Sequence, residues 1–199
     1  DLTDVKDFWE TTLLGYLSSL QQPYAKGRSQ LQLILQHILH LLAPHRDSAL
    51  DLDKLNRLPF SKLKEFVHRI VAAMPTHFPM VHGHHDVLRA LFYLNSPHGH
   101  AANLAYSWLQ GLGLERSEKT SLGLTAPQKS PLDLVKGMSS LLALRGPIIL
   151  GLDQLDSIVS QQHTLSETSP EGDQADAQRA ALSIIEGIGM GLSALVRNV

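Results

Sequence analysis

Residues Gly146–Val159, GPIILGLDQLDSIV, decide which fold we expect for this chain. The stretch begins with a Gly-Pro pair, continues as the apolar run Ile148–Leu152 and ends with Asp153, Gln154, Leu155 and Asp156. A short apolar run bounded by turn residues is typical of a strand buried on both faces in a parallel sheet. Open α/β sheets bind their ligands at the carboxyl ends of such strands. The stretch therefore predicts an α/β fold with these carboxylates at the ligand-binding edge.

The same residues resemble the Walker B segment of P-loop NTPases, and Asp-Gln-Leu-Asp resembles the Asp-Glu-hydrophobic-Asp form of AAA+ and STAND-type ATPases. The resemblance implies ATP and Mg²⁺ as cofactors, with Asp153 holding the metal ion. Those families place a glutamate next, to polarise the attacking water, and this chain has Gln154. Because an amide positions water but cannot accept its proton, the resemblance implies slow hydrolysis or a carboxylate supplied by Asp156. The alternative is an aspartate that caps the helix after a core strand.

The phosphate-binding half of that resemblance is missing from the sequence. No G-x-x-x-x-G-K-[ST] loop occurs, so the phosphates have no glycine-lysine cradle. In the family order that loop precedes Asp1 and a sensor strand follows Val199, so we expect a fragment that binds nucleotide weakly or not at all. A resemblance of lower specificity, to parts of large bacterial ATP-binding proteins, some of them tied to phage defence, covers Asp1–Leu20, Asp86–Ser96 and Ala105–Leu114.

The resemblance implies a mostly helical fragment of a P-loop NTPase core, with few parallel strands and a helical insertion. Residues 1–22 would be a strand end and a helix of the core. Residues 23–130 would be the insertion. Residues 131–199 would be the Walker B strand and its following helix.

Composition limits the class of protein. The chain has 199 residues, 43% of them hydrophobic and 18% charged, which fits a folded globular protein. Its net charge of -2 does not indicate a nucleic-acid-binding face. The absence of cysteine excludes disulfides and thiol catalysis and favours the cytoplasm. The longest apolar stretch, Leu31–Ala43, is too short to span a bilayer, so we expect no membrane association.

Apolar spacing predicts several amphipathic helices. Ser29 and Pro131 are expected to start two of them, and Pro75 to end a third. Residues 45–59 are expected to hold a short helix, and residues 111–130 are expected to form a loop. The predicted long helices span 6–21, 29–42, 60–74, 87–94, 101–110, 131–144 and 173 or 176 to about 198.

Three further sequence patterns bear on binding or catalysis. His82, His84 and His85 lie close together, and imidazoles suit zinc, copper or nickel, although no H-E-x-x-H pattern accompanies them. The plainer interpretation is solvated loop histidines. Arg89 lies one turn from Asp86 and forms either an intrahelical pair or a contact to DNA or a neighbouring subunit. Gly187 and Gly191 permit a close approach to the last helix, for packing or for partner docking.

One alternative function remains open at this point. It is a non-catalytic, all-helical protein-interaction module in which the segment before Asp153 ends a buried helix. The expected partners are nucleotide under the ATPase hypothesis, and another protein or a second copy of the chain.

Overall fold

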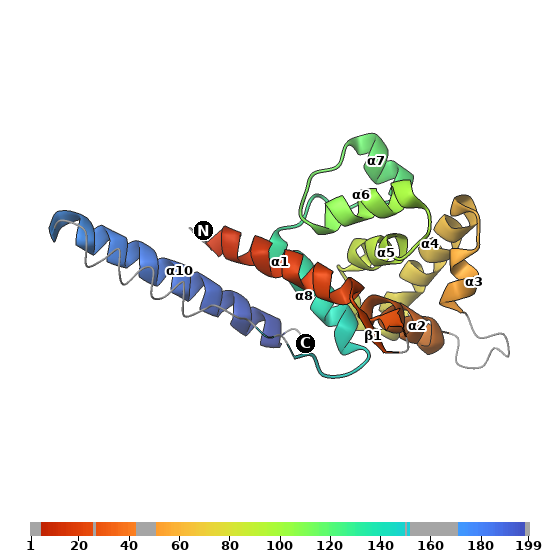
Figure 1. Ribbon diagram of the computed structural model, residues 1–199, viewed down its shortest axis with the longest axis horizontal. Coiled ribbons are helices and arrows are strands. Elements are labelled where there is room, and N and C mark those ends of the chain that lie inside the picture. Colours follow the sequence, from red (N-terminus) through yellow and green to blue (C-terminus); the bar gives the residue numbers. More distant parts are fainter. Residues whose placement is uncertain (1–4, 26, 43–50, 150, 152–170, 198–199) are drawn as a thin grey trace.

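The computed structural model describes residues 5–25, 27–42, 51–149, 151 and 171–197, which form a helical protein with one small hairpin (Figure 1). The longest helix, α10, extends well beyond the body formed by the others (Figure 1). The elements are α1 (Val5–Gln21), β1 (Pro23–Ala25), β2 (Arg28–Ser29), α2 (Gln30–Leu42), α3 (Leu52–Asn56), α4 (Phe60–His77), the 3₁₀ turn η1 (Pro79–Val81), α5 (His85–Leu94), α6 (Gly99–Leu109), α7 (Arg116–Leu122), α8 (Pro131–Ala143) and α10 (Glu171–Arg197).

The predicted α/β fold is wrong. The sheet in the described part of the chain is a two-stranded antiparallel hairpin that pairs Pro23 with Ser29, and no parallel strand occurs there. Residues 147–149 are neither strand nor helix, and the Ile149 side chain is 97% exposed. Residues 147–149 have no described neighbouring strand to bury them, so this part of the apolar run is neither a central strand nor the end of a buried helix. A P-loop NTPase core with few parallel strands and a helical insertion is therefore not what this chain forms.

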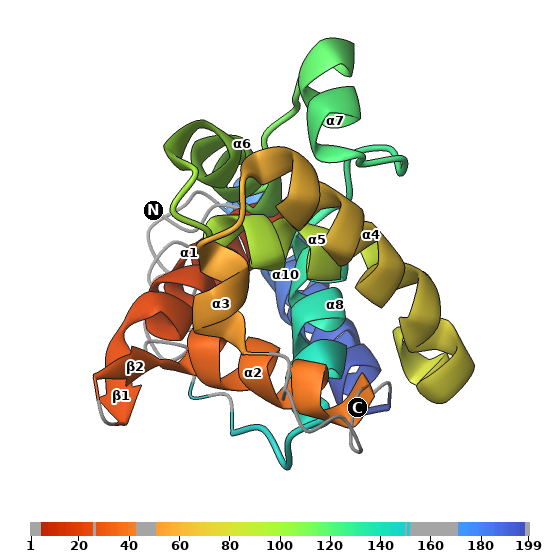
Figure 2. The ribbon, with the colours of Figure 1, turned by 90° about the vertical axis from the view of Figure 1, so that its right-hand side faces the viewer.

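Helix α5 is the centre of the core (Figure 2). All its residues from Asp86 to Tyr93 are buried, because its apolar side chains pack into the core and the buried Asp86 and Arg89 pair with each other. Helices α4, α6 and α8 pack around it. The protein is thus organised around a buried helix and not around a buried strand.

The two ends of the described chain pack on one side of this core. Helix α1 packs along α8, where the Tyr16 hydroxyl and the Ser139 hydroxyl hydrogen-bond at 3.0 Å in a buried position. The predicted division of the chain into segments 1–22, 23–130 and 131–199 stays a prediction.

Helices α1 and α10 run side by side in the same direction (Figure 1). A Cβ at Gly187 would lie 2.7 Å from Val5, and one at Gly191 would lie 2.3 Å from Trp9. A step of four residues on α10 thus matches a step of four on α1, as parallel helices require. Of the two roles that the sequence allowed, the glycines serve packing, here against helix α1, and not partner docking.

The predicted long helices are confirmed, with small shifts at their ends. Ser29 and Gln32 hydrogen-bond reciprocally at the start of α2, and the Ser130 hydroxyl caps α8 just before Pro131. Pro75 does not end α4, because it lies in the last turn, where one lost hydrogen bond costs little. Helix α7 lies within the predicted loop 111–130, and the hairpin was not predicted.

Candidate docking groove beside helix α1

An open groove of about 840 Å³ lies between α1, the hairpin, the start of α2 and the residues that follow α8. Its floor is apolar and buried, formed by Phe8, Tyr16, Leu20 and Ile34. A volume of this size is in the range of pockets that hold ligands or partner side chains.

One wall of the groove is a strip of small side chains on α1. Thr11, Gly15 and Ser19 follow at steps of four residues, so they lie on one face of the helix. A Cβ at Gly15 would meet no atom within 4 Å, so this wall is open at its middle. The groove is therefore accessible along the helix.

The opposite wall is formed by residues 147–149, which we call the arm. Its Ile149 side chain is 97% exposed, and Tyr24 of the hairpin, on the groove's rim, is 72% exposed. The last backbone hydrogen bond before the arm joins the Gly146 amide to the Ala143 carbonyl, and within the described residues Ile148 and Ile149 make none. The arm thus offers apolar side chains and unpaired peptide groups together.

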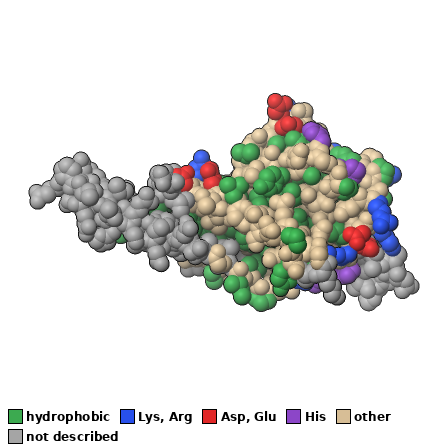
Figure 3. Space-filling model, in the orientation of Figure 1, with side chains coloured by type: hydrophobic (Ala, Val, Ile, Leu, Met, Phe, Trp, Pro, Cys, Tyr) green, Lys and Arg blue, Asp and Glu red, His purple; other side chains and the backbone are tan. Residues whose placement is uncertain are grey.

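Arg145 is the one charged side chain among the described residues that line the groove. It is exposed and forms no ion pair with a described residue. The face of the body that includes α1 has hydrophobic and uncharged side chains over its centre, with charged groups towards its margins (Figure 3). An anionic group of a ligand would therefore find its counter-charge at Arg145.

The titratable groups of the groove do not form an acid–base pair. No Asp, Glu or His side chain is among its described lining residues. Burial raises the pKa of Tyr16, and the hydrogen bond to Ser139 opposes this only in part, so the phenol stays protonated.

The sequence-predicted site residues Asp153, Gln154 and Asp156 lie outside the described residues. Gly151, two positions before Asp153, lines the groove. The structure therefore does not test their roles towards Mg²⁺ or the attacking water.

His82, His84 and His85 contact one another or a neighbouring helix. The His82 and His85 rings contact edge to face at 5.5 Å, while His84 packs against Gly137 of α8. His98 hydrogen-bonds to the Leu58 carbonyl at 2.9 Å. Across the residues that the structure describes, no three His, Asp or Glu side chains are placed to hold a metal ion.

Sequence reasoning missed the groove residues because none of them belongs to a chemical motif. Thr11, Gly15 and Tyr24 carry no spacing signature, and Arg145 was only the residue before the expected strand. The one available signal was a strip of small residues on the predicted helix. Thr11, Gly15 and Ser19 recur every four residues and lie outside its apolar face.

Comparisons with protein-family models, with curated proteins and with solved structures give no match for this chain. None of the described helices is both long enough and apolar enough to cross a membrane.

Proposed function

We propose that this chain is a non-catalytic, cytoplasmic helical module that binds an extended apolar segment of a partner protein in the groove beside α1. The observation that carries the proposal is the arm, where an isoleucine exposed to 97% stands next to peptide groups that make no hydrogen bond to a described residue. The groove at whose rim it lies has a buried apolar floor and a partly polar lining. An extended segment can satisfy such peptide groups and cover such side chains at once.

The charge at the groove narrows the partner further. Arg145, next to the arm, forms no ion pair with a described residue, and a guanidinium binds carboxylates through two parallel hydrogen bonds. The preferred segment therefore carries an acidic side chain or a terminal carboxylate beside its apolar residues.

The test is a selection of displayed random octapeptides against the full chain, followed by fluorescence anisotropy with the synthetic consensus peptide. We expect alternating apolar residues with one acidic position, and roughly tenfold weaker binding to Arg145→Gln, as for loss of a charged hydrogen bond. Arg57→Gln, a change at an exposed arginine outside the groove, is the matched control. Failure to enrich any such peptide would remove this function.

The Walker B resemblance supports a second candidate, in which Asp153 holds Mg²⁺ with ATP and Gln154 and Asp156 act on water. What favours it is Ile149, whose exposed side chain is available to pack against a nucleotide-binding partner. ATP binding would be measured by equilibrium dialysis for the wild type and for Asp153→Ala. Equal binding by the two proteins would remove Asp153 from any nucleotide site.

A further inference from the structure

A second, smaller cavity of about 320 Å³ lies away from the groove, between α4, α5 and the end of α7. Helix α4 contributes Ser61, Lys64, Glu65 and His68, whose spacing places them on one face. Helix α5 contributes Arg89 and Tyr93, and the α7 end contributes Leu122 and Gly123.

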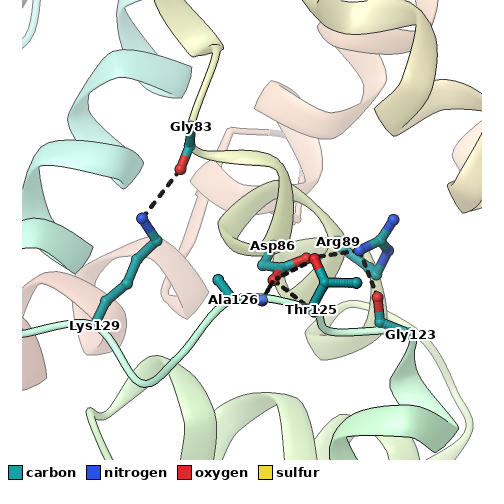
Figure 4. Close-up of polar contacts among 7 residues, drawn as sticks. All are labelled: Gly83, Asp86, Arg89, Gly123, Thr125, Ala126 and Lys129. Carbon is teal, nitrogen blue, oxygen red and sulfur yellow. Dashed lines mark hydrogen bonds and ion pairs between the residues drawn. The ribbon is translucent and has the colours of Figure 1, made fainter.

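The Arg89 guanidinium is held rigidly at this cavity. Its Nη1 donates to Asp86 Oδ1 and to the Gly123 carbonyl oxygen, each at 2.6 Å (Figure 4). The other Asp86 oxygen accepts from the Thr125 and Ala126 amides at 2.8 and 2.7 Å. The pair is therefore fixed from both sides, with Arg89 only 8% exposed.

This network leaves donors unused. Arg89 has five N–H donors, and its Nη2 and Nε make no hydrogen bond to a described residue. In Figure 4 one guanidinium nitrogen makes both contacts while another points away from them. These free donors are not among the buried side-chain atoms that lack a partner, so they are open to solvent and available to an incoming acceptor.

Tyr93 is the buried side chain of this cavity that lacks a hydrogen-bond partner among the described residues. The Tyr93 residue is fully buried, and its hydroxyl has no hydrogen-bond partner in the described part of the protein. Burial raises the pKa of Tyr93 to about 12, with Arg89 opposing the rise, so the hydroxyl stays a donor at physiological pH.

The charges around the cavity leave a positive excess. Arg89 is paired with Asp86, and Glu65 is paired with Lys62 at 3.4 Å on the solvent side. Lys64 donates to the neutral Thr120 carbonyl and forms no ion pair with a described residue. Its charge is therefore uncompensated.

The left-handed turn at Gly123 keeps the cavity open. Gly123 ends α7 with φ of 69°, a conformation that favours glycine. A Cβ there would lie 3.8 Å from Lys64 and 3.9 Å from Arg89, so the space between the two cations would narrow. The glycine thus preserves room for a small group.

We propose that this cavity binds a small anion through a carboxylate or phosphate group, which accepts hydrogen bonds from Arg89 and Tyr93 and pairs with Lys64. The volume suits a small molecule. The site shares no lining residue with the groove beside α1 and does not depend on the function proposed for it.

The test titrates the full chain separately with inorganic phosphate and with acetate, following backbone amide shifts by NMR. Saturable shifts at Gly123 with either probe are expected, and the stronger probe names the anion class. Tyr93→Phe and Lys64→Met should each weaken binding roughly tenfold, as for loss of a hydrogen bond to a charged group. Tyr106→Phe and Lys54→Met, which lie outside the cavity lining, should bind as the wild type does.

Tyr93→Phe keeps the fold because it removes only an unpartnered hydroxyl from a packed ring, so its result is interpretable. Shifts that rise linearly without saturation with both probes would overturn the proposal. So would saturable binding that Tyr93→Phe leaves unchanged.

Discussion

Helix α5 and the arm are both apolar, yet one is the centre of the core and the other lies in solvent. From Val87 to Tyr93 every side chain is buried, whereas Ile149 is 97% exposed. The difference lies in the neighbours, because α4, α6 and α8 surround α5 while no described element covers the arm's outer side. Apolar content alone thus does not identify the organising element of a fold.

The largest effect should come from breaking the ion pair inside α5. Asp86→Ala leaves the buried Arg89 guanidinium without its carboxylate and removes the acceptor of two backbone amides. Loss of one partner from a buried pair costs about 3–5 kcal/mol, measured as the free energy of unfolding in urea.

The matched control is Asp53→Ala, which removes the exposed partner of Arg28 and should cost no more than about 1 kcal/mol. If the two substitutions cost the same, α5 would not be the rigid centre that its burial indicates.

A smaller effect is expected at the contact between α10 and α1. Gly191→Leu places a side chain where Trp9 lies, because even a Cβ would come within 2.3 Å of its ring. Overpacking of this kind costs about 1–3 kcal/mol. Gly189→Leu is the control, since a Cβ there meets no atom within 4 Å and stability should stay close to wild type. Tryptophan fluorescence during urea unfolding measures both variants.

His84, at the start of α5, should make the free energy of unfolding depend on pH. Burial, with help from the nearby Lys129 charge and against Asp133, lowers the pKa of His84 below its usual 6.5. As the pH falls, His84 is therefore protonated at a higher pH in the unfolded chain than in the folded protein. Stability contributed by neutral His84 should be complete above about pH 6.5 and decline as the pH falls towards the lowered pKa.

Urea titrations between pH 7.5 and about pH 5 measure this slope, and His84→Gln should make it shallower. His100→Gln is the control, because the His100 side chain of α6 is exposed. An equal slope in the wild type and in His84→Gln would show that His84 does not link α5 to pH.

The smallest effect is expected in the arm. Ile149→Ala removes atoms that are already in water, so the free energy of unfolding should change by less than about 0.5 kcal/mol. Leu91→Ala, inside α5 at 1% exposure, should cost about 2–5 kcal/mol. A cost at Ile149 that approached the cost at Leu91 would mean that the arm belongs to the core.

The helices were predictable because each carries its own local signals. The apolar period of α2, the Ser29–Gln32 capping pair and the proline at the start of α8 depend only on residues close in sequence. Helix α7 was missed because its seven residues, Arg116–Leu122, bury only Leu122 and therefore show no apolar period.

The fold class was not predictable in the same way. Whether Ile148 and Ile149 form a buried strand depends on partners distant in sequence, and a local pattern does not report them. An intrahelical Asp86–Arg89 pair was one of the alternatives that the spacing allowed. Its contacts to Gly123, Thr125 and Ala126 come from a segment for which the sequence predicts a loop. The groove and the anion cavity likewise arise only when separate helices meet.

Native-state hydrogen exchange compares α5 and the arm most directly. We expect the amides of Leu88–Tyr93 to exchange only through global unfolding, with the protection that the whole free energy of unfolding supplies. The amides of Ile148 and Ile149 should exchange at nearly the rate of an unprotected peptide. Equal, strong protection of both segments would contradict the account, because the arm would then be hydrogen-bonded within the core.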